Sequence, residues 1–192
     1  MGTLVQFAAS GTDSATVMQA LDAAERAVAH VDALMSFHSA ESELTRINRL
    51  AHQAPQRVSA WTYAVLRRAQ RLSELSAGLF DICVAPDLVR QGLLPRMCAV
   101  PSERGKWREL QLLPDRHISF ARPLLIDLGG IAKGFAVDVA VQALRRAGCT
   151  QVFIGMESLT PKNLAAAQKN QNDVRDLENL IAAYHNEDIM TH

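Results

Sequence analysis

The sequence predicts a mixed α/β (α+β) fold, because segments with the period of helices alternate with short apolar runs typical of strands. The clearest helical periods lie at residues 17–35 and 131–147. A turn at 114–116 (Pro-Asp-Arg) separates segments 109–113 and 117–121, which together indicate a β-hairpin. With 192 residues, 48% of them apolar, the chain is long enough for a domain with a buried core.

The chain begins with a segment, residues 3–8, that alternates well enough for a strand. Turn residues at 11–14 separate it from the first helix. In that helix the apolar residues recur at alternating steps of four and three, which predicts a stripe that faces the core. The stripe consists of Val17, Leu21, Ala24, Val28, Val31 and Met35.

Two further helices are expected in the first half of the chain. A short helix starts after Ser42 and covers residues 43–48. Ser59 can cap a helix from residue 60 to about 76, and Gly78 suits a left-handed end to it. The inner face of this helix is expected to carry Trp61, Val65, Ala69 and Leu72.

The middle of the chain is expected to contain strands and an irregular connection. Residues 80–84 resemble an extended segment that Pro86 ends, and residues 90–105 are rich in turn formers. The apolar run at 124–126 suits a buried strand, and 151–154 a last one. The helix over 131–147 should present one apolar face, made by Ile131, Phe135, Val139 and Ala143.

The segment that follows the predicted strand at 124–126 combines several features of a ligand site. The strand would deliver Asp127 to its end, and Gly129 and Gly130 let the backbone approach a ligand or turn with positive φ. The free N–H groups of the next helix face the same place. Lys133 opposes the helix dipole at a cost of ~0.3–1 kcal/mol, which favours a role in binding a phosphate. The residues alone fit an anion or metal site and an ordinary strand–turn–helix joint equally well.

Two other segments are candidates for ligand contacts. Asp81, beside Phe80, could accept hydrogen bonds from a heterocycle or a ribose, although a carboxylate that fixes its own turn is the simpler interpretation. Met1, together with Met35 and His38, could bracket a planar ring, although methionine often only fills space.

Composition excludes several classes of function. The formal net charge is zero, which argues against a nucleic-acid partner and gives no reason to expect binding to an acidic membrane. No apolar run reaches the ~18–20 residues of a membrane helix, and the first residues are not those of a secretory signal, so we expect a cytoplasmic location for the chain as given. The three cysteines are far apart, which argues against a disulfide framework or a zinc site.

Four segments, in this order, resemble the ApbE-like FAD:protein FMN transferase family over residues 1 to about 155. They are MGT at 1–3, SELTRIN at 42–48, SAGLFDICVAP at 76–86 and DLGGIAKGFAVD at 127–138. The resemblance implies an α/β flavin-binding fold that uses FAD and Mg²⁺. It also implies transfer of FMN from FAD to a Thr or Ser hydroxyl of an acceptor flavoprotein, such as a redox-pump subunit, with AMP as the leaving group.

The resemblance also implies which residues bind the ligands. Gly130 lies where the family supplies a metal ligand, which glycine can offer only through its backbone carbonyl. His38 lies where the family has a tyrosine that stacks on the ligand. No catalytic residue is implied. The positions that match FAD contacts are Met1, His38, Leu79, Phe80, Asp81, Asp127 and Lys133.

The sequence departs from the family pattern in three ways. His38 would stack more weakly than tyrosine and would be pH-sensitive. Met1 is both the motif residue and the first residue, whereas family members often carry an export segment and act on the periplasmic side. After residue 155 the family continues with a half that brings metal ligands, and residues 156–192 resemble none of it.

From these departures we expect a truncated family domain at 1–155 and a divergent helical tail at 156–192. We expect FMN transfer to be impaired, since the metal ligands of the missing half would be lost. The alternatives are an inactive protein that still binds FAD and a protein-interaction module.

Overall fold

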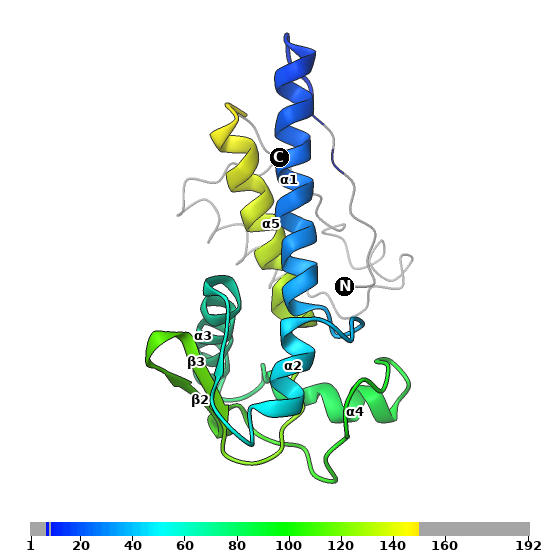
Figure 1. The fold of residues 1–192 in the computed structure, drawn as a ribbon, viewed down its shortest axis with the longest axis vertical. Helices are drawn as coiled ribbons and strands as arrows, with labels where there is room; N and C mark the ends of the chain where they lie inside the picture. Colours follow the sequence, from blue (N-terminus) through cyan, green and yellow to red (C-terminus); the bar gives the residue numbers. More distant parts are fainter. Residues whose placement is uncertain (1–6, 8, 150–192) are drawn as a thin grey trace, which may run out of the picture. The chain divides into compact units, whose positions relative to one another are not determined.

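The computed structural model describes residue 7 and residues 9–149 (Figure 1). The helices are α1 (Ser14–Met35), α2 (Glu43–Leu50), α3 (Ala60–Leu75), α4 (Ala85–Arg90) and α5 (Gly129–Arg146). The strands are β1 (Gln56–Arg57), β2 (Leu110–Leu113) and β3 (His117–Phe120), and the short 3₁₀ turns are η1 (Ile82–Val84), η2 (Trp107–Glu109) and η3 (Pro114–Arg116). Apart from residue 7, the predicted strands at 3–8 and 151–154, the domain boundary at 155 and the helical tail lie outside the described residues.

The chain divides into two compact units, Met1–Ala147 and Gly148–His192, and every described helix and strand belongs to the first. The mixture of helices and strands confirms the predicted α+β class.

Local capping explains where the first three helices begin. The carboxylate of Asp13 accepts hydrogen bonds from the first-turn amides of α1. The hydroxyls of Ser42 and Ser59 each accept one from the amide three residues on, at 3.1 Å in both cases. Serine and aspartate are favoured at these positions because they satisfy amides that the helix leaves unpaired. The helices predicted after Ser42 and Ser59 are thereby confirmed.

The two long helices form one side of the core. α1 packs along α5, and Figure 1 shows the two helices, blue and yellow, side by side. The buried residues of α5 include three alanines, Ala132, Ala136 and Ala140, which allow a close approach. The buried stripe of α1 consists of Ala20, Ala24, Val31 and Met35. Both long helices predicted from the sequence are therefore confirmed, but their predicted faces only in part. On α1, Val17, Leu21 and Val28 are half-buried, and on α5, Ile131 is buried whereas Phe135, Val139 and Ala143 are half-buried.

A small antiparallel sheet of order β1-β3-β2 packs near α3. β2 and β3 form the predicted hairpin, in which Leu110 pairs with Phe120 and Leu113 with His117. Its turn uses positive φ at Asp115, 53°, and at Arg116, 59°. The Gln70 side chain donates a hydrogen bond of 2.7 Å to the carbonyl of Leu110, which ties the sheet to α3.

The prediction that residues 80–84 are extended is wrong. The Asp81 side chain accepts a hydrogen bond from the Cys83 amide at 2.9 Å, and this bond starts the 3₁₀ turn η1. Pro86 does not end a strand but lies in the first turn of α4, where proline needs no N–H donor. A local side-chain bond therefore outweighs the apolar pattern.

The segment at 124–126 is buried as predicted but is not a strand. The Asn48 side chain, on α2, accepts a hydrogen bond from the amide of Ile126 and donates one to its carbonyl, each at 2.9 Å. One side-chain amide thus makes the pair of bonds that a neighbouring strand would make.

The prediction that Leu72 lies on the inner face of α3 is wrong, because this side chain is 40% exposed.

We predict that Asn48→Ala destabilises the protein by about 2–4 kcal/mol, because it leaves a buried N–H and a buried C=O without partners. Urea unfolding followed by circular dichroism measures this change. Gln53→Ala is the control, since the exposed Gln53 makes only a 3.5 Å bond to the carbonyl of Arg49. Equal stabilities of the two variants would contradict the role assigned to Asn48.

Candidate functional site

The site is built around Asp127, at the amino-terminal end of α5. The Asp127 amide donates a hydrogen bond of 2.8 Å to the carbonyl of Ile82, which joins this segment to the η1 turn. α5 begins at Gly129, two residues earlier than expected, so Lys133 is its fifth residue and lies in the second turn. Leu128, the N-cap residue, offers no side-chain hydrogen bond. The first-turn amides are instead partly engaged by neighbouring groups, since the Asp127 carboxylate interacts with the Gly129 amide and the Ile131 amide donates a hydrogen bond of 3.0 Å to the Leu128 carbonyl.

Asp127 carries an unfavourable charge in this position. Partial burial raises the pKa of its carboxyl above the ordinary value of 3.8. The nearby amide of Gly129, the charge of His38, the amide of Leu128 and the charge of Lys133 oppose this shift without cancelling it. A partly desolvated carboxylate with a cation nearby is typical of a ligand-binding position.

Two motifs that lie about 50 residues apart in the sequence meet at Gly130. A Cβ atom placed on Gly130 would lie 3.5 Å from Cε2 of Phe80, so the phenyl ring packs against this glycine. The preceding turn places the ring: Gly78 has a φ of +88°, and the Ser76 hydroxyl accepts a hydrogen bond of 3.0 Å from the Phe80 amide. A left-handed residue at this helix end favours glycine, as predicted.

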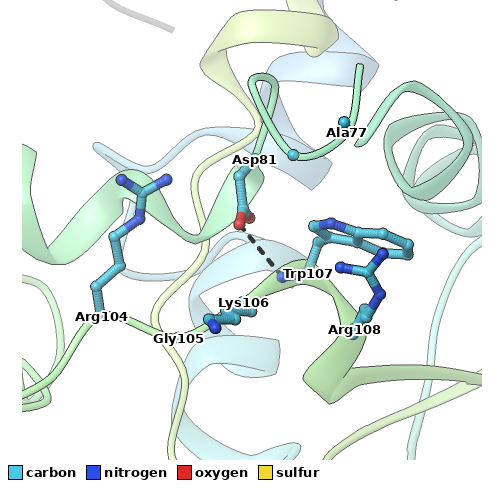
Figure 2. Close-up of a pocket in the computed structure, with 8 residues that line it drawn as sticks. Ala77, Asp81, Arg104, Gly105, Lys106, Trp107 and Arg108 are labelled. Atoms are coloured by element: carbon cyan, nitrogen blue, oxygen red, sulfur yellow. Dashed lines mark hydrogen bonds between the residues drawn. The ribbon is translucent and has the colours of Figure 1, made fainter. Parts of the chain in front are cut away.

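The carboxylate of Asp81 lies in an open cavity of about 480 Å³ (Figure 2). In addition to the Cys83 amide, it accepts a hydrogen bond of 3.4 Å from the Trp107 amide. The Arg108 guanidinium lies 4.3 Å from the centre of the Trp107 ring, and Figure 2 shows the two side chains together. The lining residues are Ala77, Gly78, Asp81, Arg104, Gly105, Lys106, Trp107 and Arg108.

The residues selected from the sequence fall into separate groups. Met1 lies outside the described residues. Phe80 meets Gly130, and Asp127 interacts with His38 and Lys133. The Asp81 side chain lies instead in the cavity with Trp107. Leu79 is 94% exposed, and its side chain makes no part of the cavity lining.

Sequence reasoning missed two features of this region. The first is Asn48, whose amide holds the segment before Asp127. The second is the cationic wall of the cavity, made by Arg104, Lys106 and Arg108. Only Arg104 lies in the stretch interpreted as an irregular connection, and a signal was present in the three cations within five positions.

A family model described as the ApbE family matches residues 1–159. The chain belongs to the ApbE family. Phe80, Asp127, Gly130 and Lys133 all fall within the matched range.

Two curated proteins of this family are similar to the chain. The FAD:protein FMN transferase of Vibrio cholerae serotype O1 is 30% identical over 152 residues, which are 74% of this chain and 45% of that protein. The FAD:protein FMN transferase of Haemophilus influenzae is 29% identical over 163 residues, 76% of this chain and 47% of that protein. The ApbE family thus contains proteins named as transferases.

A solved structure supports the fold. The flavin transferase ApbE from Vibrio cholerae matches with a TM-score of 0.63 and 31% identity, over 75% of this chain and 50% of that structure. The chain therefore spans about half the length of the relatives that it matches.

The described residues do not by themselves fit a magnesium site. Within this part of the chain, no three His, Cys, Asp or Glu side chains lie close enough together to hold a metal ion. Gly130 is the second residue of α5, and helical carbonyls point toward the carboxyl end of the helix, away from the first-turn amides. Asp127 provides a carboxylate at this helix end, but Gly130 adds no side-chain ligand beside it. The same part of the chain contains no helix that is long and apolar enough to span a membrane.

We predict that Asp127→Asn raises the stability of the protein at pH 7. The raised pKa means that the ionised carboxyl is less favourable in the folded than in the unfolded state at neutral pH. Below the ordinary value of 3.8, both states hold the neutral acid, so the gain should disappear as the pH falls through this range. Thermal unfolding of both proteins between pH 3 and pH 7.5 measures the difference.

Asp22→Asn, on the exposed side of α1, is the matched control. A stability gain for Asp127→Asn that persists at pH 3 would show that its cause is not the charge of Asp127.

Proposed function

We propose that this chain binds FAD and takes part in the transfer of FMN to an acceptor protein. The observation that carries the proposal is the meeting of Phe80, Gly130 and Asp127 at the amino-terminal end of α5. An aromatic ring, a partly buried carboxylate and helix amides together offer what a molecule with rings, hydroxyls and phosphates requires. The proposal also rests on the names of the similar proteins, which are FAD:protein FMN transferases.

Each residue group has a distinct part in the proposed binding. The Phe80 ring provides apolar surface for a planar group of FAD. Asp127 accepts hydrogen bonds from N–H or O–H groups, which would recover part of the free energy lost by its desolvation. The positive end of the α5 dipole and the exposed Lys133 favour the negatively charged pyrophosphate. His38 lies near enough to influence the charge of Asp127 and lines the same region.

The proposed reaction is a phosphoryl transfer. A hydroxyl oxygen of the acceptor protein forms a bond to the phosphorus of the FMN part of FAD, the pyrophosphate bond breaks, and AMP leaves while the hydroxyl proton is lost. Such reactions depend mainly on positioning and on neutralisation of charge. Mg²⁺ belongs to the proposal through the family resemblance, and no step proposed here is assigned to it.

A second candidate, binding of FAD without transfer, is favoured by one observation. Asp127 is the carboxylate at this site, and the described residues hold no cluster of metal ligands. Because lost electrostatic contacts in a transition state cost about 2.7–4 kcal/mol each, a chain that binds FAD at this site would transfer FMN slowly.

We predict that the purified chain quenches FAD fluorescence on binding, and that Asp127→Ala weakens binding by about tenfold or more. A hydrogen bond to a charged group contributes roughly 1.5–3 kcal/mol, which corresponds to this change in Kd. Lys133→Ala should weaken binding in the same direction. Arg145→Ala, near the far end of α5, is the control and should leave the Kd unchanged.

Transfer is measured separately, by incubation with FAD, Mg²⁺ and a flavoprotein acceptor, followed by in-gel flavin fluorescence. Labelling that Asp127→Ala abolishes supports the transferase, whereas binding without labelling supports the second candidate. Absence of FAD binding at millimolar FAD would overturn both.

A further inference from the structure

The Asp81 side chain makes hydrogen bonds to two backbone amides of the protein itself. One carboxylate oxygen accepts a hydrogen bond of 2.9 Å from the Cys83 amide, and the other accepts one of 3.4 Å from the Trp107 amide. Figure 2 shows the carboxylate directed toward the backbone of Trp107 rather than out of the cavity. Both partners are main-chain groups, so this residue connects two segments of backbone that lie 26 positions apart.

The segment that donates the Trp107 amide is held firmly. A methyl group on Gly105 would overlap the Leu124 side chain, so the backbone at Gly105 lies directly against the buried segment that leads to Asp127. Glu109 bonds both to the Lys106 amide, at 2.7 Å, and to the guanidinium of Arg122. The loop at 104–107 is therefore a fixed point against which the Asp81 turn is held.

The turn around Asp81 is attached on its other side to the candidate site. The Ile82 carbonyl accepts a hydrogen bond of 2.8 Å from the Asp127 amide. Phe80 directly precedes the two attached residues, and its ring packs against Gly130. The position of the ring thus depends on a turn with two attachments. Asp81 bonds it to the 104–107 loop, and Ile82 bonds it to Asp127, just before α5.

We propose that Asp81 is a positioning residue, which holds Phe80 against Gly130 through its bonds to the Cys83 and Trp107 amides and does not itself contact FAD. A carboxylate suits this position because it accepts from two N–H groups at once. The negative charge of Asp81 also partly neutralises the positive charge of Arg104, Lys106 and Arg108, which line the same cavity. The effect on FAD rests on the proposed function, whereas the effect on Phe80 does not.

The sequence offers a matched pair of variants that isolates one of the two bonds. Trp107→Pro removes the indole and the amide N–H, whereas Trp107→Ala removes the indole alone. Proline fits this position, because Trp107 is the first residue of a 3₁₀ turn and Lys106 before it is extended, with φ −122° and ψ 148°. The difference between the two variants therefore reports the hydrogen bond to Asp81.

The first measurement is the ¹⁹F NMR spectrum of protein that carries 4-fluorophenylalanine at position 80, without FAD. Trp107→Ala should keep the resonance of the parent protein. Trp107→Pro and Asp81→Ala should move it toward the position of the free amino acid, and Asp81→Asn, which keeps one acceptor oxygen, should move it less. Gly130→Ala, which places a methyl 3.5 Å from the ring, confirms that the resonance senses this contact. Circular dichroism establishes that each variant is folded.

The second measurement is the Kd for FAD of the same variants. Trp107→Pro should bind FAD about fivefold more weakly than Trp107→Ala, as expected for one hydrogen bond of ~1 kcal/mol. An unchanged ¹⁹F resonance in Asp81→Ala would overturn the inference, as would equal spectra for Trp107→Pro and Trp107→Ala. Loss of FAD binding in Asp81→Asn with an unchanged resonance would also overturn it, because Asp81 would then contact FAD directly. If the parent chain does not bind FAD, the proposed function fails, and the NMR spectra still decide whether Asp81 positions Phe80.

Discussion

The candidate site depends on the pair of hydrogen bonds between the Asn48 side chain and the backbone of Ile126. Ile126 is fully buried and pairs with no strand among the described residues, where Asn48 supplies partners for both its N–H and its C=O. The same bonds fix the segment that precedes Asp127, and α5 begins two residues after Asp127. One side chain on α2 thus determines where the carboxylate and the helix amides of the site lie.

The arrangement that makes the site useful also costs stability. Burial raises the pKa of Asp127, which means that its charge is tolerated rather than preferred in the folded chain. The packing of α1 along α5, with three alanines buried on α5, offsets such a cost through apolar contact. The α1–α5 pair thus provides stability, whereas the ligand site carries a destabilising charge, as is common where function requires a group that the fold does not favour.

Helix starts and turns that depend on residues close together in the sequence were predicted correctly. Ser42 and Ser59 cap helices through bonds to amides three residues away, and the turn at 114–116 forms the expected hairpin. The errors at 80–84 and 124–126 both arise from hydrogen bonds between a side chain and the backbone. At 80–84 the bond from the Cys83 amide to Asp81 is local, whereas the bonds between Asn48 and Ile126 join distant segments that no local pattern reveals. The contact between Phe80 and Gly130 is likewise invisible to periodicity.

The bonds that hold the site share a chemical feature. Asn48 bonds to the backbone of Ile126, Asp81 bonds to the backbone of Cys83 and Trp107, and the Asp127 amide bonds to the Ile82 carbonyl. Because every residue except proline carries the same N–H and C=O groups, these bonds need only a few defined side chains. We therefore expect most other positions to tolerate substitution while this geometry persists.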